Sequence, residues 1–194
     1  MGLYAEAIAS VETLFGNAAQ SGVRDPRAGV LATADARGRP SARVVVLQSV
    51  DEQGFVFVTD SDSRKGRQLA ENPLGALCFY WQEMREQVRI EGPVDVLSEA
   101  ESDSCWSMRS RERQLAAWAS EQSKPLESRE VLEERLRGYR ERFGFEQVSR
   151  PPRWQGYRLR PERIEFWKSG WHRLHEVRCY EKTEDGWSRS LLNP

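Results

Sequence analysis

The sequence predicts an α+β protein whose strands pair antiparallel. Short apolar or β-branched runs follow one another along the chain and are separated by Gly-containing turns, which favours hairpins. Helical segments are grouped between runs of strands instead of alternating with single strands, which disfavours a parallel sheet. The 194 residues include 39% hydrophobic side chains, enough for one domain over 1–194 with its own core.

The chain begins with an amphipathic helix over about residues 3–17, followed by a break at Asp25-Pro26. One apolar face recurs at helical spacing: Tyr4, Ile8, Val11 and Phe15. Further helices are predicted at 63–71, 99 to about 109, 114–119 and 128–143. Ser98 and Glu101 fit a capping box at the start of one of them. In the last helix the expected buried stripe is Val131, Leu132, Leu136 and Tyr139.

Nine segments have strand character. Turn signals at 35–40 and 51–54 separate the first three, which we expect to form hairpins. The expected strands are 28–34, 43–48, 55–59, 74–81, 87–97, 154–160, 163–167, 176–180 and 187–192.

Composition excludes several classes of protein. The 29 basic and 30 acidic side chains leave a formal net charge of −1, which argues against a dedicated nucleic-acid binder. Seven Trp, seven Phe and five Tyr argue against disorder. No apolar run approaches the roughly 20 residues that a membrane span requires. The N-terminus carries acidic residues and does not resemble a signal peptide, so a cytoplasmic location is expected.

The cysteines and histidines do not predict a metal site. Cys78, Cys105 and Cys179 are widely spaced and form no CxxC pair, so buried or half-buried thiols are expected. Only two histidines are present, His172 and His175. The common dinucleotide, P-loop and Ser-hydrolase motifs are also missing from the sequence.

Ser63-Arg64-Lys65-Gly66 is a candidate anion-binding segment, because it follows a strand and opens a helix. Backbone N–H groups at a helix N-terminus attract anions, and two cations beside a hydroxyl strengthen the effect. Arg43, at the start of an otherwise apolar strand, is a second candidate. The alternatives are a solvated helix start for the segment and an edge-strand charge for Arg43.

Three further polar features are candidates for a site. Gln87 precedes a strand, where its amide is positioned to bind the edge of a heteroaromatic ring, and Gln122-Ser123 form a polar loop. Surface positions are the alternative for both. Arg173 and His175 alternate, so in a strand they share one face. A cation and an imidazole together suit an anionic substrate and proton transfer near neutral pH, and the alternative is a satisfied surface pair.

The order of several motifs resembles the FMN-dependent pyridoxamine-phosphate-oxidase family over about residues 23–187. The motifs are R-x-V-V-x-x, G-F-V-F-x-T, S-R-K-G, N-P, Q-V-R-I-E-G, A-W-A-S-x-Q-S, I-E-F-W and R-L-H-E. Each is short, but their joint order is specific. The resemblance implies a split β-barrel that works as a homodimer with FMN at the subunit interface.

The resemblance also implies cofactor residues. The matching positions are Arg43, Val44, Val45, Val46, Val58, Thr59, Arg64, Lys65, Gln87, Gln122, Ser123 and Trp167. One position departs from the family, because Val177 stands where an Arg is frequent. Arg178 is adjacent, but in a strand it faces the other side. We expect FMN binding to persist through the remaining contacts.

The substrate positions implied by the resemblance are less well kept. Relatives that form the vitamin hold a phosphate with Lys, Tyr, Arg and Ser, and the matching residues here are Gln48, Cys105, Arg109 and Arg113. Of these only Arg109 is retained. Arg173 and His175, which contact the substrate over the flavin in those relatives, are both present and are the expected catalytic residues.

This pattern is similar to the phenazine-biosynthesis branch of the family, as is Trp106 before Arg109. The resemblance therefore implies an H2O2-forming oxidase of a dihydrophenazine carboxylate that passes electrons to O2. The C-terminal S-L-L-N-P departs from both branches. The alternatives are a pyridoxine/pyridoxamine 5′-phosphate oxidase, a flavin-binding module without oxidase turnover, and a dimeric barrel that has lost its cofactor.

Overall fold

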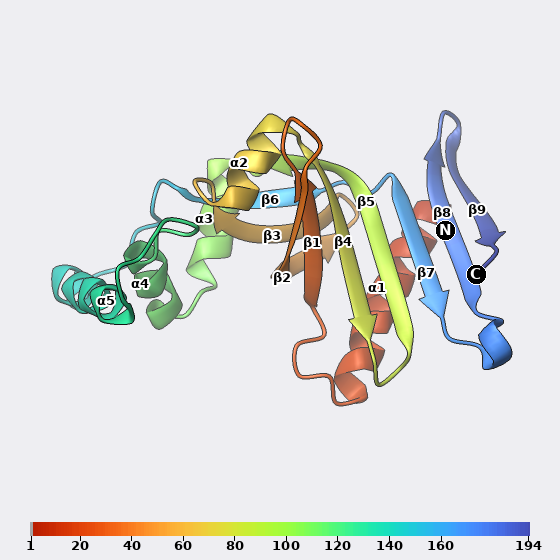
Figure 1. Cartoon of the computed structure of the whole chain (residues 1–194), viewed down its shortest axis with the longest axis horizontal. Helices are drawn as coiled ribbons and strands as arrows, with labels where there is room; N and C mark the ends of the chain where they lie inside the picture. The colour runs from red at the N-terminus through yellow and green to blue at the C-terminus, as the bar shows by residue number, and fades with distance from the viewer. Residues whose placement is uncertain (1) are drawn as a thin grey trace.

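The computed structural model describes residues 2–194 and confirms an α+β split barrel (Figure 1). One antiparallel sheet runs in the order β4-β1-β2-β3-β6-β5-β7-β8-β9, and a second pairing between β4 and β5 closes its first six strands into a barrel. The strands are β1 Ala28–Ala34, β2 Pro40–Asp51, β3 Gly54–Asp60, β4 Leu74–Trp81, β5 Glu86–Val96, β6 Trp154–Leu159, β7 Arg163–Lys168, β8 Glu176–Thr183 and β9 Gly186–Leu192. The helices are α1 Leu3–Gln20, α2 Arg64–Glu71, α3 Glu99–Ser107, α4 Arg111–Ala119, α5 Arg129–Phe143 and the 3-10 turn η1 Trp171–Arg173.

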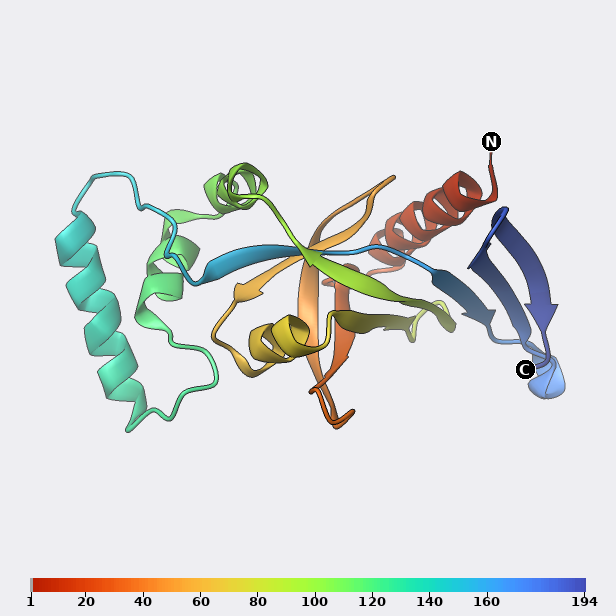
Figure 2. The same cartoon turned by 90° about the horizontal axis from the view of Figure 1, so that it is seen from above.

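The helices occupy different sides of the barrel. α1 contacts β2, β8 and β9, and the two chain ends lie on the β8–β9 side of the molecule (Figure 1). α4 and α5 pack on each other and project on the opposite side, as the view from above also shows (Figure 2). No helix among residues 2–194 is long and apolar enough to cross a membrane.

The main core fills the barrel and the space under α1. Register places Leu31, Leu77, Ile90 and Ile164 opposite one another on successive strands, and all four are fully buried. Because side chains alternate along a strand, this row defines the inner face of the sheet, and residues one or three positions away lie on the outer face. That assignment places the site residues described below.

A second core joins the barrel to α3, α4 and α5. Trp106 and Trp154 meet edge to face at 5.1 Å between ring centroids, and Trp106 Nε1 donates to the Val148 carbonyl oxygen at 2.8 Å. Trp118 extends this cluster towards α5 by packing against Tyr139, with ring centroids 5.5 Å apart. The predicted capping box of Ser98 and Glu101 is present at the start of α3.

The predicted helices and strands are all present, with ends shifted by a few residues, but two predictions are wrong. The stripe of α5 is only half-buried, because the helix packs on α4 and the second core and not on the barrel. The segment around Arg173 and His175 is not a strand. It forms η1 and a turn, with positive φ at His172 (51°) and Arg173 (67°), and β8 begins only at Glu176.

Gly92 lies where β5 leaves β4 and β7 to pair with β6. A Cβ at this position would collide with the Arg160 carbonyl oxygen, which belongs to the backbone and cannot move aside. We expect Gly92→Ala to lower the free energy of unfolding by about 1–3 kcal/mol in urea titrations. Gly138→Ala is the control, because a Cβ there meets nothing and α5 should gain about 0.5–1 kcal/mol. Equal midpoints for both variants would contradict the assigned close approach.

Candidate functional site

Three cations gather near the start of α2, which packs against β1. Ser63 caps α2, and its hydroxyl accepts from the Gly66 N–H at 3.2 Å. Arg64 and Lys65 follow directly, and Arg43 reaches the same place from β2. A capped helix start beside three cations is the arrangement that the sequence predicted as an anion site.

The Lys65 ammonium is held entirely by neutral oxygens. Its Nζ lies 2.8 Å from Thr59 Oγ1, 2.9 Å from Gln122 Oε1 and 3.4 Å from Ser63 Oγ. The Arg64 N–H donates to Ser123 Oγ at 3.0 Å. The loop after α4 therefore meets the start of α2, and the structure brings these predicted residues together.

Arg43 points to the inner face of the sheet. Its Nη1 donates to the Leu31 carbonyl oxygen at 3.1 Å and to Thr33 Oγ1 at 2.7 Å, and its Nη2 bonds the Ser41 hydroxyl. The edge-strand interpretation of Arg43 is wrong, since β2 lies between β1 and β3. Val44, Val45 and Val46 alternate beside it, with Val45 buried in the main core and the other two exposed on the outer face. Val58 packs against the second core.

Burial and, next, neighbouring positive charge disfavour the charged forms of Arg43 and Lys65. Burial and, next, the charge of Arg64 lower the pKa of Arg43. Burial and the charge of Arg43 lower the pKa of Lys65, and the Asp60 carboxylate opposes this shift. Neighbouring positive charges that lack a carboxylate partner of their own are relieved by a bound anion. The cluster is thus suited to a phosphate group.

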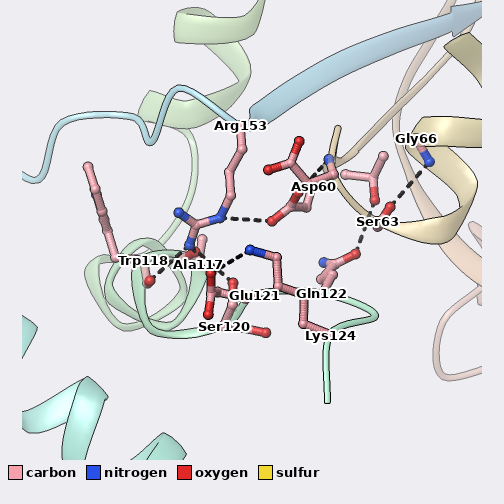
Figure 3. A network of polar contacts seen from close by, with 12 residues as sticks. Asp60, Ser63, Gly66, Ala117, Trp118, Ser120, Glu121, Gln122, Lys124 and Arg153 are labelled. Carbon is pink, nitrogen blue, oxygen red and sulfur yellow. Dashed lines mark hydrogen bonds and ion pairs between the residues drawn. The ribbon is translucent and has the colours of Figure 1, made fainter. Parts of the chain in front are cut away.

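Arg153 is a residue of this region that the sequence analysis missed (Figure 3). It precedes β6, and its Nε donates to Asp60 Oδ2 at 2.9 Å. Its Nη2 donates to the carbonyl oxygens of Ala117, Trp118 and Ser120 at 3.0, 2.9 and 3.1 Å. The end of α4 is therefore fastened to the end of β3. No local motif around Arg153 signals this role.

A cavity of about 220 Å³ opens next to this network. Its lining includes the paired Asp60 and Arg153 of the network, together with Arg109, Arg113, Gln122 and Trp154. The guanidinium of Arg109 lies over the Trp154 ring, 5.4 Å from its centroid, and its buried Nε has no hydrogen-bond partner in the described chain. Burial and the charge of Arg113 lower the pKa of Arg109. The cavity can therefore accept a second anionic group.

Two of the predicted substrate residues lie outside this cavity. Cys105 is only 7% exposed within the second core, where burial raises the pKa of its thiol. Gln48 is the extra residue of a β-bulge in β2, and its Nε2 donates to the Val46 carbonyl oxygen at 3.4 Å. Neither side chain offers a charge to an anion.

Gln87 and Trp167 lie on the other side of the sheet from Arg43. They pair across β5 and β7, and Val177 pairs with Trp167 across β8. Gln87 and Trp167 lie three residues from the inward-facing Ile90 and Ile164 of their strands. Because side chains alternate, Gln87 and Trp167 face outward, and Val177 beside them does too. Arg178 faces inward as predicted, with its guanidinium 5.1 Å from the centroid of the Phe166 ring. Within one copy of the chain, the cation cluster and the pair of Gln87 and Trp167 therefore lie on opposite faces of the sheet. These are the two halves of the expected cofactor site.

The turn after β7 selects one tautomer of a neutral His175. The Gly170 N–H donates to His175 Nδ1 at 3.1 Å, so a neutral imidazole carries its proton on Nε2. The His175 ring lies 4.8 Å from the Trp167 ring between centroids. Arg173 is exposed on the same turn. His175 and Arg173 therefore lie on the turn next to the outward-facing Trp167, and a tight turn, not a strand, places them there.

Family models and curated relatives that match this chain all point to the same protein family. The family model described as pyridoxamine 5′-phosphate oxidase matches residues 15–143, and that of the pyridoxine 5′-phosphate oxidase C-terminal dimerisation region matches 154–194. A curated pyridoxine/pyridoxamine 5′-phosphate oxidase from Alkalilimnicola ehrlichii is 51% identical over 196 residues and 100% of both chains. The enzyme of that name from Anaeromyxobacter dehalogenans is 48% identical over 96% of this chain and 94% of its own.

Two solved structures are similar to the whole chain. PhzG from Burkholderia lata 383, in complex with tetrahydrophenazine-1-carboxylic acid, has a TM-score of 0.92 at 37% identity, covering 96% of this chain and 92% of that one. An FMN-binding protein from Nostoc punctiforme has a TM-score of 0.75 at 20% identity, covering 100% and 99%, and shows the shared fold.

The cation cluster predicts that inorganic phosphate raises the melting temperature of the cofactor-free protein. We expect Lys65→Met to weaken phosphate binding about tenfold, because a charge-assisted hydrogen bond contributes about 1.5–3 kcal/mol. Lys124→Met is the control, since Lys124 pairs with Glu121 at 2.8 Å in the neighbouring loop (Figure 3). Thermal shift titrations with phosphate measure both. An equal loss in the two variants would show that phosphate does not bind at this cluster.

Proposed function

Since this chain belongs to the pyridoxamine 5′-phosphate oxidase family, we propose that it is an FMN-dependent oxidase of a small anionic aromatic substrate, with O2 as electron acceptor and H2O2 as product. One observation carries the proposal. Arg43, Arg64 and Lys65 converge at the start of α2, and the partners of the Lys65 ammonium are neutral oxygens. That arrangement suits a phosphate monoester.

The residues present fit FMN. The flavin phosphate is a dianion, and the three cations and the N–H groups at the start of α2 match its charge. Gln122 and Ser123 lie beside the cations through Lys65 Nζ and the Arg64 N–H. The family match supports the same cofactor.

The flavin ring requires a second copy of the chain. Gln87 and Trp167 face outward, whereas Arg43 faces inward, so one copy cannot surround one flavin with both sets. The outer face also exposes apolar side chains, among them Val44 at 65% and Tyr80 at 55%. Such a face suits burial against another subunit. A homodimer with FMN at its interface agrees with the matched C-terminal dimerisation region.

When bound, FMN supplies a hydride acceptor that O2 reoxidises. The protein orients the substrate and handles charge. Arg173 pairs with the anionic group nearest the flavin or with an electron-rich ring atom, depending on the substrate. His175 donates a hydrogen bond from Nε2, because its Nδ1 is occupied by the Gly170 N–H. An imidazole so fixed can give its Nε2 proton to the substrate but cannot take up a second one, because Nδ1 accepts the Gly170 N–H.

We infer that the substrate is a reduced phenazine carboxylate. Cys105 is buried, and Gln48 bonds to its own strand, so two positions that hold a phosphate in vitamin-forming relatives offer no charge here. Arg109 above Trp154 provides one cation beside an aromatic surface, which suits a flat ring bearing a carboxylate. The similarity to PhzG, bound to tetrahydrophenazine-1-carboxylic acid, supports this substrate class.

Pyridoxine or pyridoxamine 5′-phosphate is the second candidate. The names of the curated relatives that match the chain over its full length favour it. In the structure, Arg109 and Arg113 line one cavity and together can neutralise a dianion. Binding of this substrate requires that the guanidinium groups of Arg109 and Arg113 both contact its phosphate.

Aerobic turnover by the FMN-loaded protein distinguishes the two substrates. We expect reduced phenazine carboxylate to be oxidised and pyridoxamine 5′-phosphate to give little aldehyde. Arg173→Ala should lower kcat/KM about tenfold or more while FMN stays bound, because it removes a charge-assisted contact to the substrate. Aldehyde formation that disappears in Arg109→Ala would favour the vitamin-forming enzyme. A yellow protein that oxidises neither compound would instead be a flavin-binding module.

Subunit mixing tests whether the site is shared. Lys65→Met damages the cation cluster, and Arg173→Ala damages the outward-facing turn. If each site takes one part from each subunit, a mixed dimer contains one undamaged site and one doubly damaged site. Unfolding and refolding an equal mixture should then restore about a quarter of wild-type activity, because half of the dimers are mixed. Activity that stays at the level of the separate variants would place both parts in the same subunit.

A further inference from the structure

Arg153 links two parts of the chain that both border the cation cluster. Its Nε donates to Asp60 Oδ2 at 2.9 Å, at the end of β3. Its Nη2 donates to three carbonyl oxygens at the end of α4, those of Ala117, Trp118 and Ser120 (Figure 3). The Arg153 side chain is 22% exposed and that of Asp60 is 7% exposed. Such a desolvated, multiply bonded guanidinium holds its partners in a fixed geometry.

The backbone strengthens this link. The Ser61 N–H donates to the Arg153 carbonyl oxygen at 2.7 Å, so Arg153 is bound to the end of β3 by its main chain as well. The Asp60 Oδ1 atom accepts from the Asp62 N–H at 2.8 Å. Asp60 therefore cannot turn away from Arg153 without losing a second bond.

The loop that Arg153 fastens contains two residues of the cation cluster. Gln122 Oε1 accepts from Lys65 Nζ at 2.9 Å and from Thr59 Oγ1 at 3.2 Å. Ser123 has a φ of 68°, which is unusual for a residue with a side chain, and its hydroxyl accepts from the Arg64 N–H. An uncommon backbone conformation of this kind persists only when the surroundings enforce it.

Arg153 also balances the charge of Asp60. The Asp60 carboxylate opposes the lowering of the Lys65 pKa, so its field reaches the cluster. An unpaired carboxylate at this place would weaken the attraction of the cluster for an anion. The positive charge of Arg153, paired with Asp60, opposes that effect at the cluster.

We propose that Arg153 is the positioning residue of the cofactor site, because it fixes the loop that carries Gln122 and Ser123. It acts through that loop and through Asp60, and it needs no contact with the cofactor. This inference rests on the proposed binding of FMN, and it adds a residue that lies outside the expected set. It also explains why the end of α4 faces β3 instead of solvent.

The test compares Arg153→Ala with Arg150→Ala. Arg150 precedes the same strand and anchors α3, through ion pairs with Glu99 and Asp103 and a bond to the Trp154 carbonyl oxygen at 2.7 Å. Its side chain is more enclosed than that of Arg153, at 8% against 22% exposed, but it makes no hydrogen bond or ion pair with the loop over 120–124. Both variants should lose stability, whereas only Arg153→Ala should disturb the cofactor site.

We expect Arg153→Ala to raise the FMN dissociation constant about tenfold or more, measured by quenching of flavin fluorescence in the cofactor-free protein, because several buried hydrogen bonds are lost. Hydrogen exchange of the amides over 120–124 should rise in parallel. Arg150→Ala should keep the dissociation constant within about twofold of the wild type. An unchanged dissociation constant in Arg153→Ala, or an equal increase in Arg150→Ala, would overturn the proposal.

Arg153→Lys separates positioning from charge and serves if Arg153→Ala fails to fold. A lysine can pair with Asp60, but it lacks the planar fork that reaches Asp60 and the three carbonyl oxygens together. Intermediate FMN affinity with faster exchange over 120–124 supports the proposal, whereas full recovery of both would overturn it. If the wild type binds no FMN, the proposed function fails, and phosphate affinity together with amide exchange over 120–124 still decides the role of Arg153.

Discussion

The alternation of side chains along strands is the constraint on which this structure depends. In a closed barrel each strand has one inner and one outer face, and the row of Leu31, Leu77 and Ile90 fixes which is which. That parity turns Arg43 inward towards α2 and turns Gln87 outward. A one-residue slip in β2 would turn Arg43 outward, and one in β5 would turn Gln87 inward. The same register therefore builds the core, separates the two halves of the site and makes assembly part of function.

Local patterns in the sequence were sufficient for the α-helices, the strands and the cationic start of α2, but not for η1 or for the approach of Arg43 to that start. Apolar spacing and turn residues predicted each α-helix and strand, because those signals are local. The S-R-K-G segment predicted the helix start correctly for the same reason. The role of Arg153 depends on contacts with residues more than 30 positions away, which no local pattern records. The relation between Gln87 and Trp167 likewise required the register of β5 with β7.

The error at Arg173 and His175 has a specific physical origin. The alternation of Arg, Leu and His looks like a strand, but Gly170 lies so close to the Leu174 carbonyl oxygen that no side chain fits there. This close approach forms a tight turn, and positive φ values at His172 and Arg173 complete it. Sequence spacing does not reveal such a turn when the residues with positive φ are not glycine. The expectation that Arg173 binds an anion and that His175 transfers a proton rests on the residue types, so it does not depend on the strand assignment.

The projecting pair of α4 and α5 has a consequence for kinetics. The pair is joined to the rest of the chain through the second core and the Arg153 bonds, and none of the residues of α5 is fully buried. Such units open as cooperative pieces well before the whole chain unfolds. Each opening carries away Gln122 and Ser123 together, since both follow α4. The frequency of this local opening therefore contributes to the residence time of whatever is bound at the start of α2, apart from the strength of the contacts themselves.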